Sequence, residues 1–296
     1  MSRARPLPEP FDRSPFTVSA ARSVGVSRSR LRAADLDAPY RGVRIRRAAT
    51  LAVSERCRAY LPLMSGSAHF SHSTAAALYG IPLPRRIESS SALHVTVVAP
   101  QHPPQAQGIV GHRVSSAALR ERDGLPICSP EQAWARLAPL LGHDELVMAG
   151  DHLVRRKRPL SSIERLSEVI SPGARGAARM RRALLEVRSG TDSPKETQLR
   201  LVLVHAGLPE PVIGHTVFDA DGFFVATPDL AYPVERVALE YEGDHHRSDR
   251  RTFADDILRR ELLEDAGWVV IRVISDHLVH PALLAGRVSR ILAARG

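Results

Sequence analysis

The stretch from Thr227 to His246, TPDLAYPVERVALEYEGDHH, constrains the fold of this chain more than any other segment. Asp229 follows a proline, and ten residues, enough for a turn and one strand, separate it from Glu240 at the end of an apolar run. If the flanking segments are strands, the two carboxylates lie side by side at one end of a sheet. Such oxygen ligands suit a hard divalent cation, usually Mg²⁺. A bound cation can polarise a phosphodiester and activate water, so the first hypothesis is a metal-dependent nuclease.

Strand alternation brings a third acid to the same place. Side chains alternate between the two faces of a strand, so Glu240 and Glu242 share a face, and Asp229 near the end of the preceding strand can meet Glu240 across the ladder. Carboxylates this close repel one another unless a cation neutralises them. We therefore predict that Asp229 and Glu240 bind Mg²⁺ or Mn²⁺. The competing interpretation is a polar strand end with solvated carboxylates.

The segments around these acids predict a mixed sheet flanked by helices, in the order αβββαβα. A DADG turn separates the first two strands, which is a good hairpin signal, and Gly207 and Gly267 end the first two helices. The predicted elements are a helix over 194–207, strands over 212–218, 223–229 and 236–242, a helix over 251–266, a strand over 268–274 and a helix over 276–294.

Two further residues near the acids are candidates for catalysis. Glu196 belongs to Ser-Pro-Lys-Glu, which fits a capping box, but a glutamate in the first helical turn can equally lean over the sheet end and join the metal through water. His246, three residues after Gly243, could act as general base, and the neighbouring His245 is its competitor. Arg259 and Arg272 are candidates for phosphate contacts, although a helical ion pair with Asp255 or Asp256 is the better explanation of Arg259.

Charge is distributed unevenly along the chain. Residues 1–190 contain 29 basic and 15 acidic residues, a net charge of +14, whereas residues 191–296 contain 12 and 17, a net charge of −5. A basic N-terminal part suits a polyanion such as DNA. Only two of the 41 basic residues are lysines, which suggests a GC-rich genome and weakens this argument without explaining the asymmetry. The alternative is an arginine-rich composition with solvated faces.

The N-terminal segment 17–36 predicts a helix-turn-helix. Ala21 is small where two helices would cross, Gly25 lies where the turn needs a positive φ, and Ser27 can cap the second helix. The following YRGVRIRR predicts a hairpin wing. A small helical hairpin without DNA contacts is the alternative. The predicted DNA-binding residues on the second helix and the wing are Arg28, Arg30, Arg32, Arg41, Arg44 and Arg46.

The rest of the chain completes a prediction of an α/β multidomain protein. We predict a lead-in over 1–15, a winged helix-turn-helix over 16–48, a middle α/β region over 49–154, a basic linker or helix over 155–191 and the metal-binding domain over 192–296. His69, His72, His94 and His112 in the middle region lack the i,i+4 spacing of a metal site and favour structural roles. Two widely spaced cysteines, no apolar run long enough to span a bilayer and no secretory signal predict a cytoplasmic protein without membrane contact.

The C-terminal motifs resemble a known enzyme family. The segment containing SPKETQLRLVL, PDLAYP, VALEYEGDHH and GWVVIRV resembles the very-short-patch-repair (Vsr)-like endonuclease domains of the PD-(D/E)XK superfamily. By that resemblance Asp229 is the central metal ligand, Glu240 and Glu242 are further acidic site residues, Glu196 is the helix acid and His246 is the site histidine. Residues 16–150 resemble the winged-helix antitoxin-like proteins of the type IV abortive-infection (AbiEi) kind.

One departure from the family pattern keeps two functions open. The superfamily motif ends in acid-x-lysine, but here it reads Glu240-Tyr241-Glu242, so Lys195 or a histidine would have to substitute. The main prediction is a DNA endonuclease, acting on DNA as a monomer or homodimer, with a toxin-like or repair partner left open. The alternative is a non-enzymatic, antitoxin-like transcriptional regulator with a degenerate nuclease fold. A nuclease acting on RNA or damaged DNA is a third interpretation.

Overall fold

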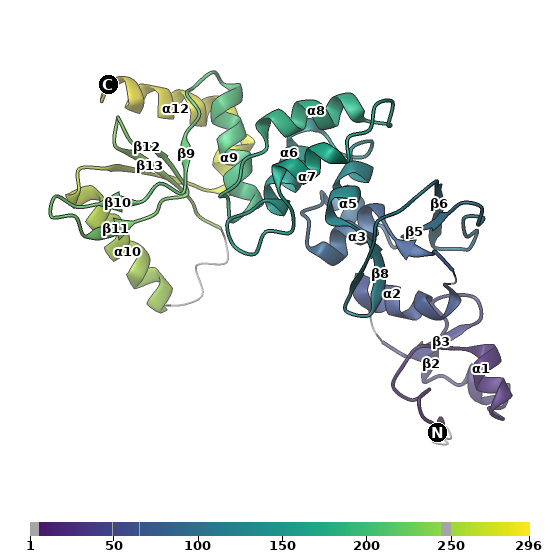
Figure 1. Ribbon diagram of the computed structural model, residues 1–296. Coiled ribbons are helices and arrows are strands. Elements are labelled where there is room, and N and C mark those ends of the chain that lie inside the picture. Colours follow the sequence, from purple (N-terminus) through teal and green to yellow (C-terminus); the bar gives the residue numbers. More distant parts are fainter. Residues whose placement is uncertain (1–5, 49, 65, 244–249) are drawn as a thin grey trace. The chain divides into compact units, whose positions relative to one another are not determined.

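The computed structural model describes residues 6–48, 50–64, 66–243 and 250–296, with the side chains of 250–257 excepted (Figure 1). The chain divides into two compact units, one of Met1–Leu141 with Glu168–Ala177 and the other of Gly142–Ser167 with Ala178–Gly296. Both units combine helices with sheets, which confirms the α/β multidomain class. No helix in the described ranges is both long and apolar enough to cross a bilayer.

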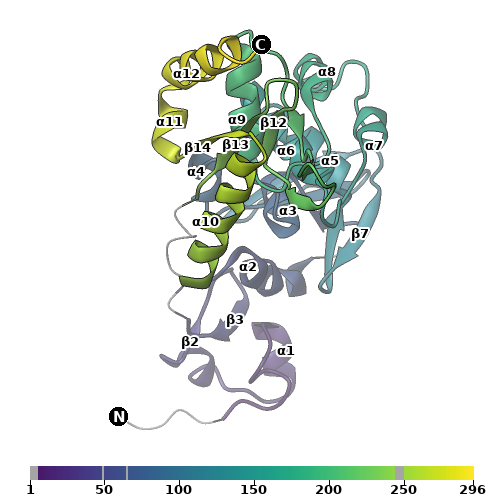
Figure 2. The same ribbon diagram turned by 90° about the vertical axis from the view of Figure 1, so that its left-hand side faces the viewer.

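The first unit begins with a small sheet and one short helix, grouped next to the N-terminus in Figure 2. Its three strands lie in the order β1-β3-β2, and β2 and β3 form an antiparallel pair within the segment predicted to be a winged helix-turn-helix. Apolar side chains from α1 and the strands, including Ala21, Leu31 and Leu36, form its core. The elements are β1 (Phe16–Thr17), α1 (Val18–Ser23), the 3₁₀ helix η1 (Arg30–Arg32), β2 (Leu36–Asp37) and β3 (Val43–Arg46).

The predicted second helix of the helix-turn-helix is wrong as an α-helix. Gly25 has the positive φ of 86° that the turn requires, and Ser27 Oγ accepts a hydrogen bond from Arg30 N at 3.2 Å. The helix that follows is nevertheless the single 3₁₀ turn η1, which ends as Arg30 turns inward to bind Asp35. A segment of this length offers far less surface to a DNA groove than an α-helix.

A five-stranded sheet in the order β6-β5-β4-β8-β7 forms the rest of the first unit. The β5–β6 and β4–β8 pairs are parallel, and α3 packs with α5 and against β5. The elements are α2 (Val53–Tyr60), the 3₁₀ helix η2 (Leu61–Leu63), β4 (His69–Phe70), α3 (His72–Tyr79), α4 (Arg85–Glu88), β5 (Leu93–Val98), β6 (Ile109–Val114), β7 (Leu119–Arg122), β8 (Leu125–Cys128) and α5 (Pro130–Leu137). Helix α3 ends at Gly80, whose φ of 73° is the left-handed cap expected of glycine.

The second unit is built on a four-stranded sheet in the order β14-β13-β12-β9, with a separate β10–β11 ribbon. Helices α9, α11 and α12 pack on one face, and α10 with the ribbon covers the other (Figure 1). The elements are α6 (His143–Leu153), α7 (Ile163–Glu168), α8 (Ala177–Glu186), α9 (Pro194–His205), β9 (Val212–Ile213), β10 (Val217–Phe218), β11 (Phe224–Ala226), β12 (Leu230–Tyr232), β13 (Val237–Tyr241), α10 (Arg250–Asp265), β14 (Val269–Val273), α11 (Ser275–Val279) and α12 (Pro281–Ala293).

Three predicted elements of this unit differ from the structure. The strand predicted over 212–218 is two strands, β9 in the four-stranded sheet and β10 in the ribbon. The strand predicted over 223–229 ends at Ala226, and a separate strand, β12, begins at Leu230 and pairs with β13. The helix predicted over 276–294 is two helices, because Pro281 excludes the residue before it, His280, from the α region. The segment 155–191 is also more than a linker, since α7 and α8 in it bury Leu166, Met180 and Ala183.

A buried ion pair joins α6 to α9. Arg200 and Asp151 are 1% and 0% exposed, and their Nη2 and Oδ2 atoms are 3.0 Å apart. Asp151 also accepts hydrogen bonds from Thr197 Oγ1 at 2.9 Å and from Arg188 N at 2.8 Å, and Arg200 Nη1 reaches Glu210 at 3.0 Å. This network fixes the position of α9, whose first turn carries Glu196.

Candidate active site

Asp229 lies next to Glu240 at one end of the four-stranded sheet. Leu230 of β12 is paired with Leu239 of β13, so the ladder places Asp229, one residue before β12, opposite Glu240. The carboxylate is fixed in place because Asp229 Oδ2 accepts a hydrogen bond from Tyr241 N at 2.8 Å. The predicted pairing of these two acids across the ladder therefore agrees with the register, although Asp229 precedes β12 and does not end β11.

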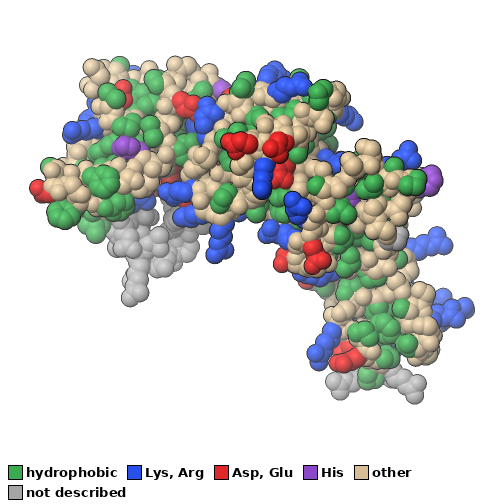
Figure 3. All heavy atoms as spheres, viewed as in Figure 1, with side chains coloured by type: hydrophobic (Ala, Val, Ile, Leu, Met, Phe, Trp, Pro, Cys, Tyr) green, Lys and Arg blue, Asp and Glu red, His purple; other side chains and the backbone are tan. Residues whose placement is uncertain are grey.

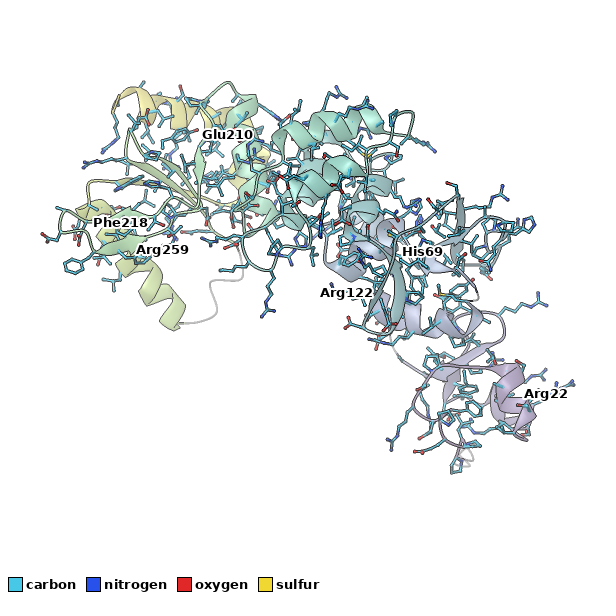
Figure 4. All side chains as sticks on the ribbon, in the orientation of Figure 1. Arg22, His69, Arg122, Glu210, Phe218 and Arg259 are labelled. Atoms are coloured by element: carbon cyan, nitrogen blue, oxygen red, sulfur yellow. The ribbon has the colours of Figure 1, made fainter. Side chains whose placement is uncertain are left out.

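Glu240 is paired with an arginine from the helix that covers this face of the sheet. Arg259 of α10 places Nη2 2.8 Å from Glu240 Oε1, and the same nitrogen donates to Thr227 O at 2.7 Å. Figure 4 shows Arg259 between α10 and the β10–β11 ribbon. The guanidinium is thus tied both to the strand acid and to the segment that leads into Asp229.

Glu242 is held in a similar way by Arg272. The two side chains form an ion pair, and Arg272 of β14 is the register partner of Glu240 in the parallel β13–β14 pair. Glu240, Glu242 and Arg272 therefore share one face of the sheet, as the strand alternation predicts. Glu240 and Glu242 stand at the positions compared with the acid-x-lysine motif, and each is paired with an arginine.

Glu196 serves as part of the cap of α9. Its Oε2 accepts a hydrogen bond from Asp192 N at 2.8 Å, and its own N donates to Ser193 Oγ at 3.2 Å. The side chain is 9% exposed, so it is directed inward and not into solvent. Ser193 caps α9 as predicted, but Glu196 reaches back to Asp192 N and not to the amide of Ser193 itself. Glu196 also lies close enough to Asp229 to interact electrostatically.

Three charged residues belong to this region that sequence reasoning missed. Asp192 forms ion pairs with Arg156 and, at 3.4 Å, with Lys157 Nζ. The negative charge of Asp192 acts on both Asp229 and Glu196. The sequence signal for Asp192 was its position directly before the Ser-Pro start of α9. Arg156 and Lys157 belong to a basic run that we had associated with a linker.

The electrostatics of the site oppose ionisation of its acids. Burial raises the pKa of Asp229, and the nearby charge of Asp192 raises it further, against the lowering effects of the Tyr241 amide and Arg259. Burial also raises the pKa of Glu196, and the charge of Asp229 is the next largest cause. A cation close to these carboxylates would favour their charged forms.

These acids do not form a closed cage of three ligands. Among the residues that the structure describes, the groups that bring three candidate ligand atoms within 4.8 Å are His72, His94 and His112, and His143, Asp144 and His205. Neither group contains Asp229, Glu240 or Glu196. Mg²⁺ fits a site of this kind, because it is commonly bound by one or two carboxylates, with waters and substrate phosphates completing its shell.

The predicted site histidine, His246, lies outside the described residues, as does its competitor His245. Lys195, which we considered as a substitute for the missing lysine, donates to Gln198 Oε1 of the same helix at 2.9 Å. Among the described cations, Arg259 is paired with Glu240 and its charge also acts on Asp229.

The six predicted DNA-binding arginines divide into two groups. Three are used within the first unit: Arg30 donates to both carboxylate oxygens of Asp35, Arg44 donates to Leu31 O and Val43 O, and Arg46 is paired with Asp12 and Asp35. Arg30 is buried and paired with Asp35, so little of its side chain is accessible at the surface. The other three, Arg28, Arg32 and Arg41, are exposed.

The surface next to Arg259 is apolar. A groove beside this residue is lined by Phe224, Ala226, Leu258 and Leu262 among others. Phe218, Phe223 and Phe224 on the ribbon are 56%, 70% and 65% exposed, and Figure 3 shows hydrophobic side chains gathered over this ribbon.

Comparison with known proteins gives relatives without an assigned activity. Over 230 residues the chain is 26% identical to two proteins of Mycobacterium tuberculosis, uncharacterized protein MT2308 of strain CDC 1551 / Oshkosh and uncharacterized protein Rv2248 of strain ATCC 25618 / H37Rv. The match covers 77% of this chain and 83% of each relative. No protein-family model and no solved structure matches the chain.

Proposed function

We propose that the second unit is a PD-(D/E)XK-like DNA endonuclease that depends on Mg²⁺ or Mn²⁺. The observation that carries this proposal is the position of Asp229, directly opposite Glu240 at the end of the β12–β13 ladder. Like charges are gathered there, and burial raises the pKa of both Asp229 and Glu196. Hard oxygen ligands in such an arrangement suit a small divalent cation.

The four acids of the proposed site would have different roles. Asp229, through the oxygen that is not bound to Tyr241 N, and Glu240 would hold the cation. When bound, the cation supplies positive charge that polarises the phosphodiester and lowers the pKa of water. Glu196 lies next to Asp229 and orients the N-terminus of α9 through its bond to Asp192 N. Glu242 keeps Arg272 at the same edge of the sheet.

Arg259 takes the place of the superfamily lysine in this proposal. Its guanidinium lies 2.8 Å from Glu240 and is fixed by Thr227 O, so it is positioned before substrate arrives. A fixed positive charge of this kind stabilises the negative charge that develops on the phosphate oxygens during in-line attack. Guanidinium groups bind phosphate in a planar, two-pronged geometry that lysine does not provide.

The first unit would supply affinity for DNA. We propose that residues 16–48 act as a reduced winged helix-turn-helix, in which the exposed Arg28, Arg32 and Arg41 contact phosphates. Binding through phosphate contacts depends strongly on salt concentration because counterions are released. The protein would act in the cytoplasm, where its buried free cysteines, Cys57 and Cys128, remain reduced.

One observation favours a second candidate, a non-enzymatic DNA-binding regulator with a degenerate nuclease fold. Glu240 and Glu242 are each neutralised by an arginine of the chain itself, Arg259 and Arg272. In this alternative the two ion pairs replace the metal and stabilise the sheet end. The basic first unit would then act alone on DNA.

Plasmid nicking in the presence and absence of Mg²⁺ distinguishes the two candidates. The variants are Asp229→Asn and Glu240→Gln, and Glu264→Gln is the matched control because Glu264 is an exposed α10 acid paired with Arg260. We expect nicking that requires metal and falls by about 100-fold or more in both site variants, the scale for losing one group that stabilises transition-state charge. Equal nicking by the wild type and both site variants would indicate contamination and reject the enzyme. Supercoiled, mismatched and single-stranded DNA and RNA, used in parallel, identify the substrate class.

A further inference from the structure

Three histidines of the first unit, distant in sequence, lie together at the edge of its five-stranded sheet. His72, His94 and His112 are each partly buried, and one ligand atom from each lies within 4.8 Å of the others. The rings of His72 and His112 are stacked with centroids 3.7 Å apart, and His94 is stacked on both at 5.3 and 5.2 Å. His94 Nδ1 and His112 Nε2 are 2.9 Å apart. His69, the fourth histidine of this region, is bound separately through Nδ1 to Ser67 O.

The fold creates this arrangement from three separate elements. In the parallel β5–β6 pair His112 is the partner of Thr96, so His94 and His112 occupy adjacent positions on one face. Helix α3 packs against β5 and begins at His72. Thr74 of that helix accepts a hydrogen bond from His94 N at 2.8 Å, which fixes the helix relative to the strand.

The first residue of α3 is held in an unusual conformation. His72 has a φ of 50°, in the left-handed region that few residues other than glycine adopt without strain. Ser71 Oγ lies 2.9 Å from His72 Nδ1 and accepts a hydrogen bond from Thr96 Oγ1 at 2.6 Å. A polar chain from the sheet therefore fixes the orientation of the His72 ring, in the manner of the partners that orient metal-binding histidines.

Electrostatics keep the three rings in the form that binds metal. Burial, followed by the charge of His112, lowers the pKa of His72 to about 2, and burial lowers the pKa of His112 to about 4 and that of His94 as well. A neutral imidazole offers one nitrogen lone pair to a cation. The charge of Arg136 also lowers the pKa of His72 and His112 and so favours the neutral rings. The same positive charge repels a bound cation, which an anion as a further ligand would offset.

We propose that His72, His94 and His112 form a binding site for a divalent transition metal ion, Zn²⁺ foremost, with a fourth position open to water or an anion. Three histidines with one open position is a recurrent zinc arrangement with metal–nitrogen distances of about 2.0–2.1 Å. Two such nitrogens at a tetrahedral angle lie about 3.4 Å apart, so the His94–His112 contact has to open by about 0.5 Å. Because the rings are stacked at interplanar angles of 11° to 29° and their lone pairs lie in the ring planes, the rings also have to turn on metal binding so that the three nitrogens converge. The ring that carries the shared hydrogen shifts to its other tautomer, and no net proton is released.

This site is distinct from the proposed nuclease site in both chemistry and unit. Imidazole nitrogens suit Zn²⁺, whereas carboxylates suit Mg²⁺. The inference goes beyond the proposed function and does not depend on it. It also competes with a simpler explanation, in which the three rings only stack and hydrogen-bond to stabilise the sheet edge.

The test is Zn²⁺ binding by the full-length chain after removal of metal with a chelator. To exclude the acidic site, all measurements use a chain that carries Asp229→Asn and Glu240→Gln. The site variant is His94→Gln with His112→Gln, which keeps polar side chains at both positions. The matched control is His143→Gln with His205→Gln, because these residues form the other described histidine group, bridged by Glu186.

A second site variant, His72→Asn, guards against misfolding, since asparagine tolerates a positive φ better than most residues. We expect one Zn²⁺ per chain, a visible absorption spectrum of tetrahedral geometry with Co²⁺, and binding weakened by about 100-fold or more in both site variants but unchanged in the control. Zn²⁺ should also raise the thermal midpoint of the parent chain and not that of the His72→Asn variant.

Three outcomes would overturn the proposal. The first is a folded parent chain, verified by circular dichroism, that retains no Zn²⁺ at micromolar metal. The second is binding that survives in the His72→Asn variant and in the double glutamine variant. The third is binding that disappears in the His143→Gln, His205→Gln control, which would assign the metal to the other histidine group.

Discussion

Replacing Asp151 with alanine should strongly destabilise the second unit. The substitution leaves the Arg200 guanidinium, 1% exposed, without its buried carboxylate partner, and it leaves Thr197 Oγ1 and Arg188 N without their acceptor. All three of these groups donate to a carboxylate, and a hydrogen bond to a charged group contributes about 1.5–3 kcal/mol. Removal of one partner of a buried ion pair costs ~3–5 kcal/mol, so we expect a loss of about 4 kcal/mol or more.

Equilibrium unfolding in urea measures this loss. The two tryptophans lie in different units, Trp134 in the first and Trp268 in the second, so a Trp134→Phe background makes fluorescence report on the second unit alone. Asp144→Ala is the matched control because Asp144 lies on the same helix with a side chain that is 55% exposed. A surface change of this kind shifts stability by about 0.5 kcal/mol or less.

A double variant distinguishes the contribution of charge to stability from that of packing. Replacing Asp151 and Arg200 together with leucine and methionine removes both charges, so we expect part of the lost stability to return. A loss of less than about 1 kcal/mol in Asp151→Ala would refute the argument that the carboxylate compensates Arg200. A double variant less stable than the single variant would mean that packing, and not charge, dominates here.

Three further predictions concern the two units separately. The hydrogen bonds from Arg30 lower the pKa of Asp35, so the ionised carboxylate stabilises the first unit above its ordinary pKa of about 3.9, and this stabilisation is lost as pH falls through the lowered folded value. Asp35→Asn should therefore lower the free energy of unfolding of the first unit by about 1 kcal/mol at neutral pH and by little in acid. Urea unfolding at the two pH values measures this, and an equal loss at both would contradict the predicted pH dependence. Arg259→Ala should lower the rate of Mg²⁺-dependent nicking by about 100-fold with little change in KM. Arg260→Ala is the control, because Arg260 is the next residue and is exposed, and it should leave the rate unchanged. Equal losses of rate in the two variants would mean that Arg259 has no role in catalysis. Arg41→Gln should lower the slope of log affinity for DNA against log salt concentration by about one, without changing sequence preference. Arg44→Gln should mainly destabilise the first unit, because Arg44 donates a hydrogen bond to Leu31 O. DNA-binding titrations at several salt concentrations distinguish the two variants.

Local signals in the sequence predicted most of the elements of the second unit. The Ser-Pro start of α9, the left-handed Gly207 and Gly267 and the apolar core of β13 all matched the structure. The spacing between Asp229 and Glu240 also gave the correct cross-strand pair. The short strand β12 was missed because three residues carry too little alternation to be distinguished from a turn.

The sequence pattern could not predict which residues distant in the chain contact one another. Arg259 and Arg272 were candidates for phosphate contacts, with a helical ion pair as the alternative for Arg259, and their partners Glu240 and Glu242 depend on how α10 and β14 pack against β13. The close grouping of His72, His94 and His112 could not be predicted from spacing along the chain, because the three rings come from one helix and two strands. The pairing of Arg30 with Asp35 likewise depends on how the chain folds after η1.

The parallel pairing of β13 with β14 has a consequence for the order in which this protein becomes functional during synthesis. Val237 is matched with Val269, so strand β13 acquires its second neighbour only after the ribosome has made α10 and β14. The hairpin of β12 and β13 is local and can form earlier, but Arg259 and Arg272 reach the acids only with that later segment. A nascent chain arrested before β14 would thus present uncompensated carboxylates and no complete sheet. The acidic end of the sheet is therefore completed only after α10 and β14 have been made.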